Sequence, residues 1–145
     1  MKNNYIVAFR RVVCDAATFL PSDVYDHSMR VMMYVMSNVD IPEDLRDACT
    51  VAAIAHDLIE DSAMSLEDLK YLPTLVYDAI DLLTKDKSVN YLQYIKNIVS
   101  SRGKSFGDVA YWVKIADMKD HLAQKDTLTD ALKAKYLKAI PYLLP

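Results

Sequence analysis

The stretch Val51-Ala52-Ala53-Ile54-Ala55-His56-Asp57-Leu58-Ile59-Glu60-Asp61 decides the fold of this chain. Its first five residues are small or apolar and include no Gly or Pro, which predicts a buried helix. Four ionisable groups follow within six residues. If the helix continues through them, His56 stacks over Glu60 and Asp57 over Asp61, because positions four apart share a helix face. His56 and Asp57 would then point about 100° apart.

These acids need a positive partner. Two stacked carboxylates repel each other, and burying an unpaired carboxylate is costly. No Lys or Arg lies between Arg46 and Lys70. We therefore expect a metal ion beside Asp57. A His-Asp pair at the end of a helix also fits an ordinary capped or solvated terminus, so the rest of the chain has to decide between the two interpretations.

The composition predicts one all-helical domain over residues 1–145, because the chain has only two Gly and many Ala, Leu, Met and Lys residues. The net charge of −3 argues against duplex nucleic acid as a partner but permits a small anionic ligand near local lysines. Cys14 and Cys49 are far apart and indicate buried thiols in a reducing compartment. We see no signal peptide and no apolar run of about 20 residues, so we expect a cytoplasmic protein outside the membrane.

Apolar periodicity predicts amphipathic helices over about residues 5–16 and 23–38, the second with Val31, Met32, Val35 and Met36 in the core. Further helices should follow Pro42 and Pro73. The stretch 101–107 is interpreted as a flexible connection, with an apolar helix from about Asp108. The expected caps and stops are Ser22, a Ser65–Asp68 capping box, Ser88, Thr127 or Thr129, and Pro141.

Polar residues with catalytic chemistry also lie within these apolar helices. The chain has three histidines, His27, His56 and His121. Asp117 stands within the apolar run Val113-Lys-Ile-Ala-Asp-Met118. Its simplest partners are Lys114 and His121, which are three and four residues away on the same helix. The alternative is that Asp117 binds a metal.

Taken together, the order His27, His56-Asp57, Asp117 resembles the HD superfamily of metal-dependent phosphohydrolases. The segment from His56 to Asp61 resembles the HD-x-x-E-D segment of the RelA/SpoT-type (p)ppGpp hydrolases and of their small stand-alone relatives. The segment Lys114-Ile-Ala-Asp117-Met-Lys-Asp-His121-Leu122 is similar to the K-[LI]-A-D-x-x-x-N-L segment of that group. The resemblance covers roughly residues 23–128 and implies a compact all-α HD-domain bundle of about six to eight helices.

The resemblance implies a set of metal ligands and a catalytic pair. The ligands would be His27, His56, Asp57 and Asp117. Two imidazoles and two carboxylates favour Mn²⁺, with Zn²⁺, Fe²⁺ and Mg²⁺ as alternatives. Glu60 and Asp61, one helical turn further along, would be the catalytic residues that orient or deprotonate a water molecule.

Substrate contacts follow from the same resemblance. Thr84-Lys85-Asp86-Lys87 and the following Tyr91 are similar to a stretch of small HD hydrolases, in which lysines would hold a phosphate and Tyr91 would stack on a base. A solvated loop and core tyrosines are the alternative interpretation. Arg30, one turn after His27, and Gln124 are further candidate substrate contacts. His121 replaces the family Asn that contacts the nucleotide, and only Pro21-Ser22-Asp23 stand where the family has a basic loop.

The sequence therefore predicts a metal-dependent phosphohydrolase of a small nucleotide, with removal of a 3′-pyrophosphate from a (p)ppGpp-like nucleotide as the leading hypothesis. A nucleotidase or phosphatase acting on another phosphorylated nucleotide is one alternative. A non-catalytic HD module that binds a nucleotide is another. Glu60 and Asp61 argue against that last alternative, because a binding module has no need of an acid pair beside a metal.

Overall fold

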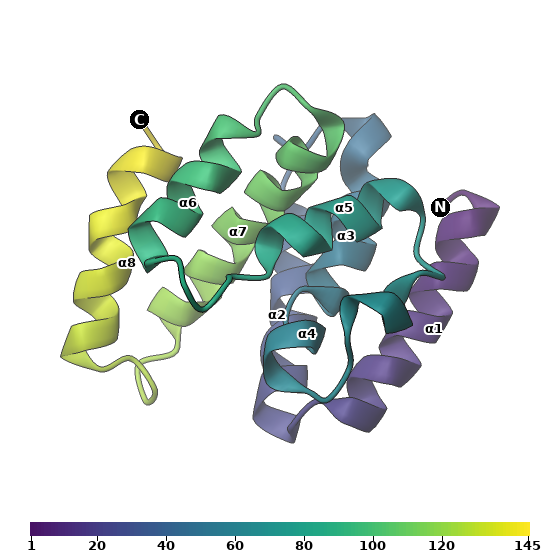
Figure 1. Ribbon diagram of the computed structural model, residues 1–145, viewed down its shortest axis with the longest axis horizontal. Helices are drawn as coiled ribbons and strands as arrows, with labels where there is room; N and C mark the ends of the chain where they lie inside the picture. The colour runs from purple at the N-terminus through teal and green to yellow at the C-terminus, as the bar shows by residue number, and fades with distance from the viewer.

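Two helices, α3 (Glu43–Ala55) and α7 (Ser105–Ala123), form the centre of the molecule. In this computed structural model, which describes residues 1–145, every side chain from Ala48 to Ala55 is buried, and so are most from Val109 to Met118. A helix that is apolar on all sides must be surrounded by protein. α3 packs against α1, α2, α5 and α7, and α7 packs against α2, α5, α6 and α8 (Figure 1).

The outer helices are amphipathic and cover this centre with one face each. They are α1 (Asn3–Phe19), α2 (Ser22–Ser37), α5 (Thr74–Leu83), α6 (Tyr91–Ser100) and α8 (Asp130–Leu143). Two short elements, α4 (Leu58–Asp61) and the 3₁₀ turn η1 (Leu66–Leu69), connect α3 to α5. One hydrophobic core of 36 buried residues runs through the bundle. The compact all-α bundle expected from the sequence is therefore confirmed.

The helix that leads to the His56-Asp57 doublet ends there, and the continuation through Asp61 that the sequence left open does not occur. α3 ends at Ala55, Asp57 has φ −100° and ψ −1°, and α4 restarts at Leu58. This backbone break changes the direction of the side chains. The Nε2 atom of His56 lies 3.1 Å from Oδ2 of Asp57, so the two side chains converge instead of pointing about 100° apart.

Several expected helix ends were wrong. Ser22 lies inside α2, with no capping hydrogen bond at that end, and Asn90 rather than Ser88 caps α6 by accepting from the N–H of Gln93. Pro141 lies within α8, which continues to Leu143. The capping box of Ser65 and Asp68 is confirmed, as is Thr129 as the cap of α8. Met36 is exposed and does not belong to the core.

The connection between α6 and α7 is shorter and tighter than predicted. α7 begins at Ser105, and the backbone of Gly107 is packed so closely that a Cβ atom there would overlap the carbonyl oxygen of Ser101. Gly103, with φ +93°, makes the turn before it. The tight packing holds the start of α7 and so contributes to the placement of Asp117 further along that helix.

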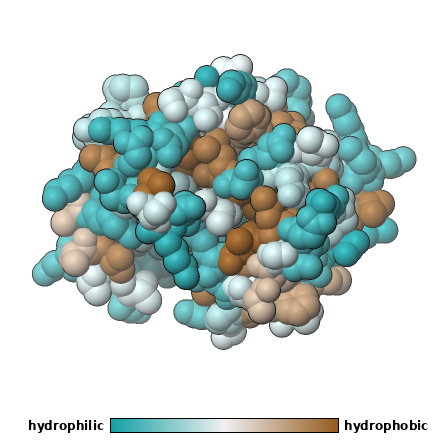
Figure 2. Space-filling view, viewed as in Figure 1, coloured by the Kyte–Doolittle hydropathy of each residue, from teal (hydrophilic) through white to brown (hydrophobic).

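The face of the molecule drawn in Figure 2 is predominantly polar, with hydrophobic side chains exposed in separate small areas. No helix combines the length and the apolarity that are needed to cross a lipid bilayer.

Candidate metal centre

Four polar side chains from three parts of the chain meet where α2, α7 and the α3–α4 break come together. His27 lies on α2, His56 and Asp57 lie at the break, and Asp117 lies in the middle of α7. His27, His56 and Asp117 are buried, and Asp57 is half-buried. These are the four residues that the sequence singled out as candidate metal ligands, and the fold brings all of them together.

The facing atoms of these residues form a closed ring. Oδ1 of Asp117 lies 2.9 Å from Nε2 of His27 and 3.5 Å from Nε2 of His56. Oδ2 of Asp57 lies 3.5 Å from Nε2 of His27 and 3.1 Å from Nε2 of His56. Neighbouring ligand atoms around an ion at about 2.1 Å are about 3.0–3.4 Å apart. The ring therefore has the size and the donor atoms that a divalent cation requires.

The orientation of His56 supports a metal at the centre of this ring. Its Nδ1–H donates to the carbonyl oxygen of Ala53 at 2.6 Å, which leaves the lone pair of Nε2 facing the ring. This Nε2 atom is buried and makes no hydrogen bond. A buried polar atom without a partner requires an explanation, and a cation bound at the ring supplies one.

His27 is held by a residue that sequence reasoning missed. Its Nδ1–H donates to Oδ2 of Asp120 at 2.7 Å, so its Nε2 faces the ring. Asp120 is fully buried, and Arg30 donates to both of its oxygens at 2.8 and 3.0 Å. Carboxylate partners of this kind fix the orientation of metal-binding histidines and raise their basicity. The sequence contains one indication of its role, because Asp120 lies one helical turn after Asp117. Nothing in the sequence indicated that Asp120 would contact α2.

In the absence of a cation, protonation of His56 and His27 supplies positive charge to the ring. Burial lowers the pKa of His56, but the negative charges of Asp57 and Asp117 outweigh burial and hold this pKa well above 6.5. Burial likewise lowers the pKa of His27, and its hydrogen bond with Asp117 again raises the pKa above 6.5. Strong attraction for protons at two adjacent imidazoles indicates a site built for positive charge.

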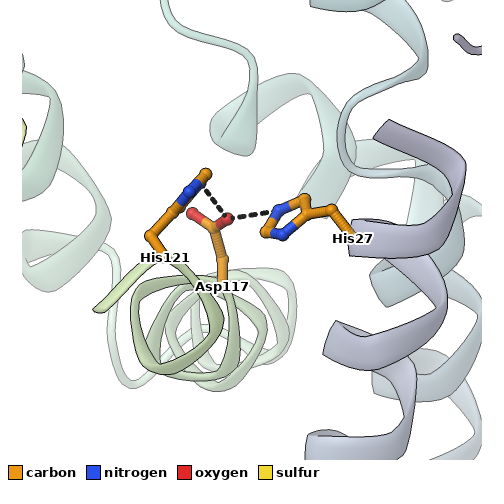
Figure 3. Close-up of side chains that lie close together, drawn as sticks. All are labelled: His27, Asp117 and His121. Atoms are coloured by element: carbon orange, nitrogen blue, oxygen red, sulfur yellow. Dashed lines mark hydrogen bonds and ion pairs between the residues drawn. The ribbon is translucent and has the colours of Figure 1, made fainter. Parts of the chain in front are cut away.

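Asp117 is the shared acceptor of the centre. Burial favours its neutral form, but the charge of Lys114, whose Nζ lies 2.5 Å from Oδ2, holds the pKa of Asp117 well below 3.8. Both partners considered from the sequence are present, because Nε2 of His121 lies 3.0 Å from Oδ1 of Asp117. Asp117 therefore faces His27 on one side and His121 on the other (Figure 3).

His121 is stacked between two rings, at 4.4 Å from the ring centre of His27 and 5.1 Å from that of Tyr136. Two overlapping groups thus have the spacing to hold an ion, His27 with His56 and Asp57, and His27 with Asp117 and His121. The His/Asp cluster is consistent with a divalent metal.

A cavity of about 660 Å³ opens on one side of the centre, and we call it the lysine cavity because Lys85, Lys87, Lys114 and Lys135 line it. Glu60 also lines it and accepts the backbone N–H of Lys85 at 2.6 Å. The substrate contacts predicted at Lys85, Lys87 and Tyr91 thus lie in one cavity beside the metal centre.

A second cavity, of about 470 Å³, also adjoins the centre, and we call it the acidic cavity because Asp23, Asp26, Asp61 and Asp126 line it. Arg30 and Gln124 line it too, but both side chains contact Asp120. Asp57, His121 and Tyr136 line both cavities. The predicted catalytic pair is therefore divided, with Glu60 in the lysine cavity and Asp61 in the acidic one. Burial, followed by the charges of Asp57 and Glu60, raises the pKa of Asp61 above 3.8.

Comparison with known proteins gives one informative match. No protein-family model and no curated protein matches the sequence. A solved structure of a metazoan orthologue of SpoT, which hydrolyses ppGpp and plays a role in starvation responses, matches with a TM-score of 0.69 at 19% sequence identity. The match covers 99% of this chain and 87% of that chain. The chain has the fold of that ppGpp hydrolase.

Proposed function

We propose that this protein is a metal-dependent phosphohydrolase of a small phosphorylated nucleotide. The observation that carries the proposal is the ring formed by His27, His56, Asp57 and Asp117, in which a buried imidazole nitrogen of His56 faces two carboxylates but makes no hydrogen bond. The ring lies beside a cavity lined by four lysines, which suits an anionic substrate. The fold of a ppGpp hydrolase supports the same conclusion.

Mn²⁺ is the cation that we propose for this centre. Two imidazoles and two carboxylates are the ligand types of a borderline divalent ion, and Zn²⁺ or Fe²⁺ suit them better than Mg²⁺ does. When bound, the cation would activate water and neutralise negative charge on the phosphoryl group. The four side chains hold the ion, and Asp120 together with the carbonyl of Ala53 keeps both histidines in the tautomer that it needs.

Glu60 and Asp61 line different cavities at the centre, and this division would suit an in-line displacement at phosphorus. In such a displacement the attacking water and the leaving oxygen lie on opposite sides of the phosphorus atom. We assign Glu60, in the lysine cavity, to orient the water and accept its proton. We assign Asp61, in the acidic cavity, to donate its own carboxyl proton to the leaving oxygen, after which solvent exchange takes the proton from Glu60 and restores that of Asp61. The bond from water oxygen to phosphorus forms as the ester P–O bond breaks.

Our leading substrate is a (p)ppGpp-like nucleotide that loses its 3′-pyrophosphate. The lysine cavity supports this choice, because its volume and positive charge suit a second phosphate beyond the one at the metal centre. The hydroxyl group of Tyr91 lines this cavity, is buried and has no hydrogen-bond partner. This hydroxyl group could donate a hydrogen bond to a phosphate oxygen of the substrate.

A nucleotidase or phosphatase is the second candidate, favoured by the same metal ring, which does not by itself require two linked phosphates. The released product separates the candidates. The leading candidate releases pyrophosphate, whereas a monoester phosphatase releases orthophosphate. A binding module without activity would release neither.

The test is a turnover assay of the Mn²⁺-loaded protein on a panel of nucleotides, with both products quantified. We expect pyrophosphate release from 3′-pyrophosphorylated nucleotides. Asp57→Ala should abolish metal binding, and Glu60→Gln should retain the metal but lower kcat about 10²- to 10⁴-fold. Glu67→Gln removes an exposed acid that pairs with Lys70, lines neither cavity, and should leave kcat unchanged. Turnover retained in both Asp57→Ala and Glu60→Gln would overturn the assignment.

A further inference from the structure

The two cavities at the metal centre carry opposite charge, and this difference restricts the substrate. Outside the ligand ring, the lysine cavity has four lysines and one acid, Glu60. The acidic cavity has Asp23, Asp26, Asp61 and Asp126 and one arginine, Arg30. The guanidinium of Arg30 is already engaged by both oxygens of Asp120. An anion that enters the acidic cavity therefore meets several carboxylates and no free cationic side chain.

The positive charge of the lysine cavity affects the pKa of a lysine that lines it. Burial lowers the pKa of Lys135, and the nearby charge of Lys114 lowers it further. Nζ of Lys135 lies 4.5 Å from the ring centre of Tyr91, whose hydroxyl lacks a partner. Lys114 is paired with Asp117, and Nζ of Lys85 donates to two backbone carbonyls. Lys87, Lys135 and the hydroxyl group of Tyr91 remain to contact an anion, so this cavity suits the phosphate groups of the substrate.

The rest of the substrate then lies in the acidic cavity. Asp57, His121 and Tyr136 line both cavities, so the two cavities adjoin at the metal centre and a molecule bound there has room in both of them. Carboxylates accept hydrogen bonds and repel anions, so the acidic cavity suits an organic group that donates N–H or O–H bonds. A phosphate chain at that end of the substrate would be repelled.

We propose that the substrate carries its phosphates at one end only, as in a nucleoside 3′-diphosphate with a free 5′-hydroxyl. The phosphates occupy the lysine cavity, and the ribose and base occupy the acidic cavity. This inference rests on the proposed function and narrows its substrate. Among nucleotides with a 3′-pyrophosphate, the chain would prefer those that lack the 5′-diphosphate which ppGpp itself carries. Asp26 and Asp126 act as specificity residues that reject a second phosphate chain.

The test compares three probes, guanosine 3′-diphosphate with a 5′-hydroxyl, a 5′-monophosphate or a 5′-diphosphate. Their dissociation constants are measured by calorimetry on Mn²⁺-loaded Glu60→Gln protein, which limits turnover. We expect the 5′-hydroxyl probe to bind about tenfold more tightly than the 5′-diphosphate probe at low salt, with a smaller difference at high salt, because salt screens exposed charges.

Charge variants identify the source of this preference. Adding Asp26→Asn and Asp126→Asn to the Glu60→Gln protein should reduce the difference about threefold, because two of the repelling carboxylates are gone. The matched control adds Asp40→Asn and Asp78→Asn, which remove the same charge from exposed acids that line neither cavity. The control variant should show the same difference in affinity between the probes as the Glu60→Gln protein.

Binding and product release decide separate questions. Equal or reversed affinities for the three probes, no binding by any of them, or equal behaviour of the two double variants would overturn the inference. Failure of the wild-type protein to release pyrophosphate from any probe would overturn the proposed function, while the binding order would still decide the charge preference. A turnover assay with the same probes should give kcat/KM in the order of the affinities.

Discussion

Replacing Asp120 by Asn tests whether the second ring nitrogen of His27 controls the metal centre. Asp120 is fully buried and accepts from Nδ1 of His27 at 2.7 Å and from two nitrogens of Arg30 at 2.8 and 3.0 Å. Asparagine keeps the size of the side chain but loses the negative charge and replaces one acceptor by a donor. Either His27 or Arg30 then faces an N–H group instead of an oxygen.

The expected loss can be estimated from these contacts. Removing a carboxylate that orients a metal-binding histidine costs about 10- to 100-fold in metal affinity. This corresponds to about 1.4–2.8 kcal/mol of binding free energy. The metal-free protein should also lose about 1–3 kcal/mol of unfolding free energy, since charge-assisted hydrogen bonds are lost while the half-exposed Arg30 regains some hydration.

The assay is a Mn²⁺ titration followed by electron paramagnetic resonance of the free ion, after circular dichroism has confirmed that the variant is helical. Asp108→Asn is the matched control, because Asp108 also lies on α7, pairs with an arginine, Arg102, and lines neither cavity. A folded Asp120→Asn protein whose Mn²⁺ affinity stays within twofold of the wild type would refute the reasoning.

Two further predictions concern stability. The pKa values of His27 and His56 are raised in the metal-free fold, so their stabilisation is present below about pH 6.5 and is lost as the pH rises through the folded values. The Tm of the metal-free protein should therefore fall between pH 6.5 and pH 9. The Tm of the Mn²⁺-loaded protein should rise over the same range, because metal binding displaces protons from the histidines. A Tm of the metal-free form that rises with pH would contradict this prediction. Gly107→Ala should cost about 2–4 kcal/mol in urea unfolding, because the new methyl group overlaps Ser101, whereas Gly103→Ala should cost only about 1 kcal/mol from its positive φ. Equal costs at the two glycines would contradict the close packing of α7.

The sequence was sufficient to predict the helices and the ring, for physical reasons that can be named. Apolar residues at helical spacing predict buried faces whatever the partner is. Asp117 and the His56-Asp57 doublet stood out because ionisable groups in apolar helices need a partner. The resemblance to HD phosphohydrolases then predicted that residues 90 positions apart would meet, and His27 and Asp117 do so.

What could not be predicted depends on contacts between distant segments. Asp120 is an ordinary acid in the sequence, and only the packing of α2 against α7 gives it His27 and Arg30 as partners. The helix break at Asp57 has no Gly or Pro to signal it. α8 continues past Pro141 because its last turn is anchored by tertiary contacts, since Leu143 is buried and its carbonyl accepts from the hydroxyl of Tyr111 at 2.7 Å.

The sequence also could not predict how the polar residues are divided between the two cavities. Glu60 and Asp61 are neighbours in the chain and on α4, yet they line different cavities at the metal centre. Lys135, from the last helix, completes the lysine cavity, although its own segment carries no motif. Such groupings arise only when α8 packs beside α6 and α7.

The central claim is that side chains from α2, the α3–α4 break and α7 bind one cation together. A crystal structure of the protein grown with Mn²⁺, with anomalous scattering measured at the manganese edge, tests it most directly. We predict one strong anomalous peak bonded to Nε2 of His27, Nε2 of His56 and carboxylate oxygens of Asp57 and Asp117. No peak inside this ring, or a structure in which His27 or Asp117 turns away from His56 and Asp57, would contradict the account.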